Sequence, residues 1–244
     1  KTAPCELEGM SNFWGAVQSF QTTFFTLSHL YFFTKTSLYF ISLYICEHCL
    51  KMSEAIQNRK IKFALVGCGR ISNNHFGSFE VLQEDCELVA VCDTDPVALE
   101  AAVKRTGAKG YACYTDMLAE TDADVIVITT PSGLHPEQAV EALEAGFHVV
   151  TEKPMATCFT DGELMVQAAD KAGKRLFVVK QNRLNATLQL LKRAVAEQRF
   201  GKIYMVHLNV FWTRPQSYYD QGGGWRGTWK LDGGAFMNQA SHYV

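Results

Sequence analysis

This 244-residue sequence lacks several features that would point directly to a class of protein. Its formal net charge is −2, so it has no excess of basic residues, and a protein that binds nucleic acid needs a basic face. Its eight cysteines are scattered, which favours free thiols in a reducing cytoplasm over a disulfide framework. Cys46 and Cys49 form a Cys-x-x-Cys pattern, but no second pair follows at the spacing of zinc ligands. We therefore predict a cytoplasmic globular protein without a metal and without a nucleic-acid partner.

The first part of the chain has a composition of its own. Residues 1–51 contain neither Asp nor Arg and are crowded with Phe, Tyr, Thr and Ser. A transmembrane helix needs about 20 mostly apolar residues, and His29 and Lys35 interrupt every such window. A secretory signal also fits poorly, because no basic region precedes the apolar stretch. We favour a non-native or disordered leader over residues 1–58, and a membrane-associated segment or a folded extension stay open as alternatives.

A strand, a glycine-rich turn and a helix follow this leader. The apolar run 61–66 predicts a buried parallel strand that leads directly into Gly67 and Gly69. Glycines here allow a tight turn and a close approach of the backbone to a pyrophosphate, which the helix N-terminus attracts. Asp93 ends the next strand, where a carboxylate binds ribose hydroxyls and repels a 2′-phosphate. The unit therefore predicts NAD rather than NADP, although Ser72 stands where the fingerprint has Gly or Ala.

Strands and helices continue to alternate as far as residue 180. Further strands are predicted at 124–129, 147–150 and 176–179, and helices at 96–106, 135–145 and 161–172. Short connections between them indicate a doubly wound parallel sheet, and so an α/β fold, over residues 59–180. Ligands of such sheets lie beyond the carboxyl ends of the strands. We expect one crevice to be lined by the residues at these ends: Gly67, Asp93, Thr130, Glu152, Lys153 and Gln181.

Four short motifs extend this pattern. They are Gly67-Cys68-Gly69-Arg70-Ile71 with His75 one helical turn on, Thr130-Pro131-Ser132-Gly133-Leu134-His135, Glu152-Lys153-Pro154, and Gly233-Gly234 followed by His242. Together they resemble the Gfo/Idh/MocA oxidoreductases over residues 61–244. The resemblance implies a Rossmann domain followed, from residue 181 to 244, by the start of an α+β domain with an open, mainly antiparallel sheet. It also implies that NAD is bound by Gly67, Gly69, Arg70, Ile71, Asp93, Thr130, Pro131, His135, Glu152, Lys153 and Gln181.

Longer segments resemble one branch of this family. They span residues 177–183, 185–192, 211–216 and 233–243, and they look like the UDP-N-acetyl-2-amino-2-deoxyglucuronate dehydrogenases of bacterial O-antigen synthesis. The resemblance implies NAD-dependent oxidation of the C3 hydroxyl of a UDP-N-acetylamino uronic acid to the 3-keto sugar, in the synthesis of lipopolysaccharide. It further implies a homotetramer for the full-length protein and, as in some relatives, recycling of the cofactor with 2-oxoglutarate.

Oxidation of a secondary alcohol needs a hydride acceptor, a base and a group that stabilises the developing alkoxide. Lys153 follows a strand at the crevice and is the candidate to hydrogen-bond the reacting hydroxyl. His242 is the candidate proton acceptor, because the ordinary pKa of histidine lies near neutrality. Asn238 lies four residues earlier, so both side chains are expected on one helical face. Many relatives carry Asp at this position, and since Asn cannot ionise, we expect it to orient the hydroxyl or the imidazole.

The implied substrate carries a diphosphate and a carboxylate. Arg183, Arg214 and Arg226 follow the predicted sheet, and guanidinium groups suit bidentate binding of both anions. Trp212 and Trp225 are candidates to stack on uracil or sugar faces, although Trp212 has an equally good alternative place in the core of a second sheet. These five residues are the predicted substrate contacts.

The alternating residues 202–212 predict a long strand of the second domain. The chain ends soon after His242, and a lone strand without partners is prone to aggregate. We therefore expect a fragment of a longer reading frame that binds NAD weakly and turns over poorly.

Three other functions stay open. Another Gfo/Idh/MocA dehydrogenase, acting on a free sugar or an inositol, is disfavoured because a neutral polyol has no use for several arginines. A non-catalytic NAD-binding sensor is disfavoured because Lys153 and His242 are both present. A membrane-anchored protein rests on the leader alone.

Overall fold

The computed structural model describes residues 56 and 58–242. The leader predicted for residues 1–58 therefore lies almost wholly outside the described residues, as do Cys46 and Cys49. Among the residues described, no helix combines the length and hydropathy needed to cross a membrane.

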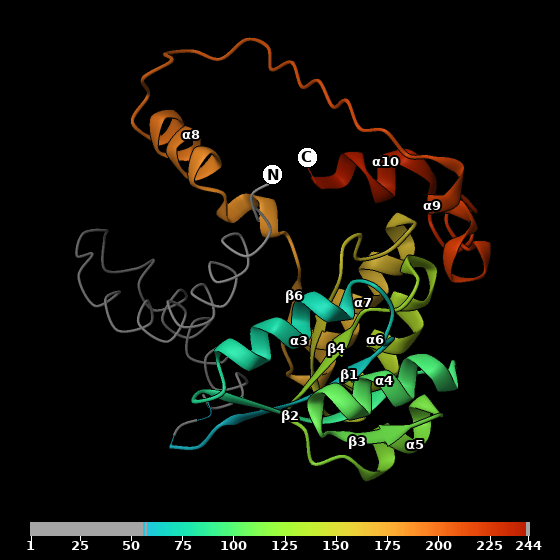
Figure 1. The fold of residues 1–244 in the computed structure, drawn as a ribbon. Coiled ribbons are helices and arrows are strands. Elements are labelled where there is room, and N and C mark those ends of the chain that lie inside the picture. Colours follow the sequence, from blue (N-terminus) through green and yellow to red (C-terminus); the bar gives the residue numbers. More distant parts are fainter. Residues whose placement is uncertain (1–55, 57, 243–244) are drawn as a thin grey trace, which may run out of the picture.

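A six-stranded parallel sheet in the order β3-β2-β1-β4-β5-β6 organises residues 61–178 (Figure 1). Its strands are β1 (Ile61–Val66), β2 (Cys86–Cys92), β3 (Lys109–Tyr111), β4 (Val125–Ile128), β5 (His148–Thr151) and β6 (Leu176–Val178). The helices between them are α3 (Ser72–Val81), α4 (Pro96–Thr106), α5 (Tyr114–Glu120), α6 (His135–Glu144) and α7 (Phe159–Ala172). The chain order reverses between β1 and β4, which is where a doubly wound sheet opens its ligand crevice.

Alternate side chains of the strands divide the core into two layers. Ala64 and Ile126 point to the face covered by α5, α6 and α7, where Leu143 is fully buried. Phe63 and Leu65 point to the other face, which α3 and α4 cover. Helices on both faces explain why the strands read as nearly continuous apolar runs. The predicted doubly wound parallel sheet is confirmed.

Most predicted elements of the sheet unit agree with the structure to within a few residues, but β3 and α5 were missed. β3 is a three-residue edge strand in which only Tyr111 is buried, so it carries no apolar run that a pattern could reveal. The thiols of Cys68, Cys86 and Cys92 are free and buried, as the sequence suggested, and those of Cys113 and Cys158 are free and exposed.

The segment after the sheet is organised differently. It contains η2 (Gln181–Leu184), α8 (Ala186–Ala196), α9 (Gln216–Asp220), η3 (Gln221–Gly224), α10 (Gly234–Asn238) and η4 (Ala240–His242). α8 stands apart from the sheet in Figure 1 and buries no residue, and an extended stretch then leads back to α9 and α10.

The prediction of a strand over residues 202–212 is wrong for this structure, since this described stretch forms neither strand nor helix. The six strands of the described chain all belong to the parallel sheet, so the expected antiparallel sheet is not formed within residues 181–242. A strand needs hydrogen-bonding neighbours, and alternation of residue types does not supply them.

Candidate active site

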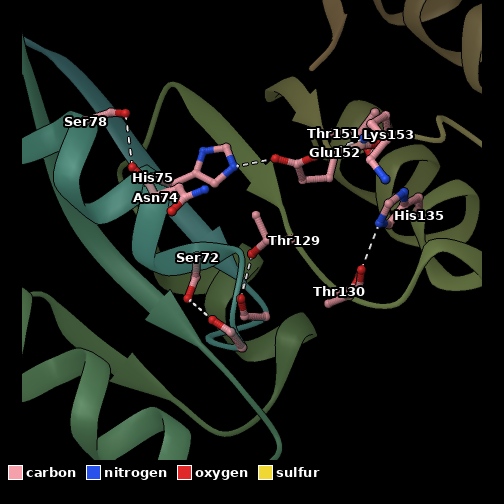
Figure 2. Close-up of polar contacts among 12 residues, drawn as sticks. Ser72, Asn74, His75, Ser78, Thr129, Thr130, His135, Thr151, Glu152 and Lys153 are labelled. Atoms are coloured by element: carbon pink, nitrogen blue, oxygen red, sulfur yellow. Dashed lines mark hydrogen bonds and ion pairs between the residues drawn. The ribbon is translucent and has the colours of Figure 1, made fainter. Parts of the chain in front are cut away.

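The glycine turn closes tightly over the end of β4. Gly67 has φ of +93°, and a Cβ atom there would lie 2.7 Å from the backbone nitrogen of Thr130. The Thr129 hydroxyl donates to the carbonyls of Val66 (2.9 Å) and Gly67 (2.6 Å), which fixes the turn against β4 (Figure 2). Only glycine fits this position, because a side chain would overlap the backbone at the end of β4 and φ lies in the left-handed region.

Open space lies beside Gly69. No atom stands within 4 Å of the position its Cβ would take, and this residue leads to the N-terminus of α3 through Arg70, which is exposed, and Ile71, which is half-buried. Ser72 is buried and its hydroxyl donates to the Gly69 carbonyl at 2.6 Å, which accounts for serine at the third fingerprint position. The free N–H groups of the helix N-terminus and the space above them fit a pyrophosphate.

Asp93 lies beside this turn, as its place at the end of β2 predicted. One carboxylate oxygen accepts from the Cys68 backbone N–H at 2.6 Å and the other from the Asp95 N–H at 2.8 Å. Each oxygen has a further lone pair for a hydroxyl group. The arrangement fits the ribose that follows a pyrophosphate.

Glu152 and His135 are both buried, and the contact with the cofactor predicted for Glu152 stays a prediction. Glu152 is 7% exposed, and His75 Nε2 from α3 lies 2.9 Å from its Oε1 (Figure 2). Burial raises the pKa of the Glu152 carboxyl, but the hydrogen bond with His75 and the charge of Lys153 outweigh it and lower that pKa. This pair ties α3 to the end of β5.

His135 joins the end of β4 to the end of β5. Its ring is 1% exposed, with Nδ1 2.9 Å from the Pro154 carbonyl and Nε2 2.9 Å from the Thr130 carbonyl. Thr130 and Pro131 lead from β4 into η1 (Ser132–Leu134) above this ring. The structure thus gives His135 a part in holding the walls of the crevice, whereas its predicted contact with the cofactor stays a prediction.

Lys153 reaches across the crevice to the end of α10. Its Nζ donates to the Asn238 backbone carbonyl at 2.7 Å and lies 3.3 Å from the Asn238 side-chain oxygen. Asn238 in turn donates from Nδ2 to the carboxylate of Asp232. Burial lowers the pKa of the Lys153 ammonium, and the carboxylates of Glu152 and Asp232 oppose this shift only in part. The sequence predicted that Asn238 orients the hydroxyl or the imidazole, and the structure places its side-chain oxygen beside Lys153.

His242 lies in η4, where the Lys180 ammonium donates to the neighbouring Ser241 carbonyl at 2.6 Å. Its ring packs edge-on against Trp212, with 5.7 Å between ring centroids. Burial, followed by the charge of Lys153, lowers its pKa to about 4. The expectation that Asn238 and His242 share one helical face is wrong, because α10 ends at Asn238 and a separate 3₁₀ turn carries His242.

Four of the five predicted substrate contacts, Trp212, Arg214, Trp225 and Arg226, come together around Tyr218. The Arg214 and Arg226 guanidinium carbons lie 5.1 and 5.0 Å from the centre of its ring. Arg214 also covers Trp212 at 4.9 Å, and Arg226 covers Trp225 at 4.8 Å. We call these five residues, Trp212, Arg214, Tyr218, Trp225 and Arg226, the Arg–aromatic cluster.

Arg183 is not part of this cluster. It lies in η2 and shares a shallow pocket with Leu188, Gln189 and Lys192. In the same turn Gln181 has a buried side-chain oxygen with no hydrogen-bond partner within the described structure, and its predicted contact with NAD stays a prediction.

The loop before α10 closes onto the sheet unit. Gly133 N–H donates to the Leu231 carbonyl at 3.0 Å, and a Cβ at Gly133 would lie 2.0 Å from the Lys230 carbonyl oxygen. This contact brings Asp232 to the crevice. Sequence reasoning missed Asp232 and Lys180. Asp232 alone carried a signal, since it directly precedes the Gly-Gly motif.

A parallel sheet with this glycine turn and an acid at the end of its second strand defines a dinucleotide-binding oxidoreductase fold. Residues 61–180 match the family described as "Oxidoreductase family, NAD-binding Rossmann fold" (GFO_IDH_MocA), and residues 188–244 match the "GFO/IDH/MocA C-terminal domain". The chain belongs to the Gfo/Idh/MocA family.

Two solved structures and two curated enzymes are similar to it. The WlbA dehydrogenase of Chromobacterium violaceum, solved with NADH and UDP-GlcNAcA, is 70% identical with a TM-score of 0.77, covering 79% of this chain and 55% of its own. The WlbA dehydrogenase of Bordetella pertussis, with the same ligands, is 62% identical with a TM-score of 0.76, covering 78% and 54%.

The curated enzymes are more distant. Inositol 2-dehydrogenase of Salmonella typhimurium is 31% identical over 150 residues, which is 60% of this chain and 45% of that enzyme. D-glucoside 3-dehydrogenase of Escherichia coli is 31% identical over 155 residues, 63% and 44% respectively. The chain thus spans about half the length of the relatives that it matches.

Proposed function

We propose that this protein oxidises the C3 hydroxyl of a UDP-N-acetylamino uronic acid to the 3-keto sugar with NAD, in surface polysaccharide synthesis. One observation carries the proposal: His242, on which the charge of Lys153 acts, adjoins the Arg–aromatic cluster through the contact of its ring with Trp212. Lys153 and His242, the two groups proposed to act on the alcohol, are thereby combined with side chains that can bind phosphate, carboxylate and aromatic rings. The complexes of the two WlbA enzymes with NADH and UDP-GlcNAcA support this choice of substrate.

Each group has a defined task in this proposal. The turn at Gly67 and Gly69, the N-terminus of α3 and Asp93 hold NAD, and bound NAD supplies the hydride acceptor. Lys153 hydrogen-bonds the reacting oxygen and stabilises negative charge as it develops. His242 accepts the hydroxyl proton, because a group whose pKa lies at about 4 is unprotonated at neutral pH.

A second candidate is oxidation of a free polyol, since inositol dehydrogenases are among the relatives. The Arg–aromatic cluster disfavours it, because a neutral polyol leaves Arg214 and Arg226 without an anion. Recycling with 2-oxoglutarate and a homotetramer remain predictions from the resemblance alone, as do direct substrate contacts by Arg183.

The test follows NADH absorbance in the intact protein with UDP-GlcNAcA and, separately, with myo-inositol. We expect turnover with the sugar nucleotide only. Lys153→Ala and His242→Ala should each lower kcat by roughly 10²–10⁴-fold while NAD still binds, as expected for loss of an acid–base group. Lys104→Ala, an exposed lysine of α4, is the matched control and should leave kcat unchanged. Turnover of myo-inositol without turnover of the sugar nucleotide would overturn the proposal.

A further inference from the structure

The buried carboxylate of Asp232 contacts Asn238, the residue that hydrogen-bonds Lys153. Asp232 is 4% exposed, and both of its oxygens have protein partners. One accepts from the Asn238 Nδ2 group, and the other accepts from the Gly227 backbone N–H at 2.9 Å. Asp232 therefore links α10 to the loop that carries Trp225 and Arg226.

Its first consequence concerns the direction of the Asn238 amide. An ionised carboxylate only accepts hydrogen bonds, so it holds the NH₂ end of the amide toward Asp232. The amide oxygen must then face the opposite way, where it lies 3.3 Å from Lys153 Nζ and 3.2 Å from Gln239 Nε2. A reversed amide would turn its NH₂ group toward an ammonium group and lose both contacts.

Its second consequence is electrostatic. The charges of Lys153, Lys180 and Arg214 all act on the space around His242. Glu152 is the other buried carboxylate near Lys153, and its side chain is engaged by His75. Asp232 provides a negative charge on the α10 side of Lys153, six residues before Asn238 in the chain.

We propose that Asp232 is a positioning residue: it orients the Asn238 amide toward Lys153 and supplies the negative charge that asparagine lacks. The inference rests on the proposed function only in assigning Lys153 to catalysis. Its structural part, that Asp232 holds the Asn238 amide with its oxygen toward Lys153, stands on the contacts alone, and the Asp232 carboxylate also acts to raise the pKa of Lys153.

The test moves the negative charge from position 232 to position 238. In the intact protein without NAD or substrate, competitive acetylation at a series of pH values, read by mass spectrometry, gives the titration midpoint of Lys153. We expect Asp232→Asn to lower this midpoint by about one pH unit, because an ammonium group loses a nearby opposite charge. The double variant Asp232→Asn with Asn238→Asp keeps one acid and one amide in contact and should restore the midpoint. Asp220→Asn, an exposed acid of α9, is the control and should change nothing.

The outcomes separate the two proposals. An unchanged Lys153 midpoint in Asp232→Asn, with melting temperature and NAD affinity retained, would overturn the role of Asp232. The single variant Asp232→Asn could fail to fold. In that case the role of Asp232 is overturned if the double variant folds but its Lys153 titration midpoint differs from that of the unsubstituted protein. The Lys153 midpoint could fall in Asp232→Asn and be restored in the double variant while the protein fails to turn over UDP-GlcNAcA. That result would support the positioning role of Asp232 and overturn the proposed function. Where turnover occurs, the basic limb of the kcat profile should move with the midpoint while the KM for NAD stays constant.

Discussion

The sheet unit and the segment from α8 to residue 212 use similar apolar residues with opposite results. In the sheet unit, Leu65, Ile126 and Leu143 are fully buried between strands and helices. In the later segment, Tyr204 is 84% exposed and Phe211 90% exposed. Local patterning is strong in both, since both alternate or repeat apolar positions at regular intervals. The difference shows that a pattern proposes an element, whereas neighbouring elements decide whether its apolar face is buried.

Hydrogen exchange should show the largest contrast between these regions. Backbone amides of β1 and β4 are paired inside the sheet, and their opening requires global unfolding, which costs about 5 kcal/mol or more. Residues 202–212, all of them described, lie outside every strand and helix. We therefore expect exchange by mass spectrometry to be at least ~10³-fold slower in β1 and β4 than in 202–212. Equal protection in both would mean that this segment finds a partner in solution.

Paired leucine truncations should give the next largest effect. Leu143→Ala empties a fully buried site in α6 and should lower the free energy of unfolding by about 2–5 kcal/mol in a denaturant titration. Leu190→Ala removes the same atoms from α8, where the side chain is 59% exposed, and should change it by less than about 0.5 kcal/mol. A large loss at Leu190 would show that α8 is covered in solution.

The parts of the site that the sequence predicted are those fixed by local rules. Gly67, Asp93, Thr130 and Lys153 follow strands of a parallel sheet, and carboxyl ends of such strands meet at one edge whatever lies between them. The Gly67 turn also depends only on backbone conformation and the adjacent β4. These residues could be placed without knowledge of any distant contact.

The parts that the sequence could not predict depend on long-range contacts. Asp232 reaches the crevice because its loop closes onto Gly133, about a hundred positions earlier in the chain. The helix expected to carry both Asn238 and His242 breaks between them, where Lys153 and Lys180 bind backbone carbonyls on either side. Periodicity alone cannot show that Lys153 and Lys180, which follow β5 and β6, donate to backbone carbonyls that would otherwise pair within the helix.

A smaller expected effect, confined to the sheet unit, is a loss of stability at low pH. His148 at the start of β5 accepts a hydrogen bond from the Arg175 backbone N–H at Nδ1, 3.0 Å away, and protonation removes that acceptor. Burial, with the charges of Lys174 and Arg175, lowers the pKa of this imidazole. A histidine whose pKa is lower in the folded state binds fewer protons in the folded state than in the unfolded state. Its stabilising contribution to the free energy of unfolding is therefore complete above the unfolded pKa, about 6.5, and declines as the pH falls below that value.

His148→Gln keeps an acceptor for the Arg175 N–H but cannot titrate. We therefore expect the loss of unfolding free energy between pH 7 and pH 5, measured by urea titration, to be smaller in this variant than in the unsubstituted chain. It should not vanish, because burial also lowers the pKa values of His135 and His242. His207→Gln places the same substitution in the exposed segment and should leave the pH dependence as it was. Equal effects of the two substitutions would contradict the contrast between a packed sheet and an exposed stretch, since only the packed imidazole has a folded environment to lose.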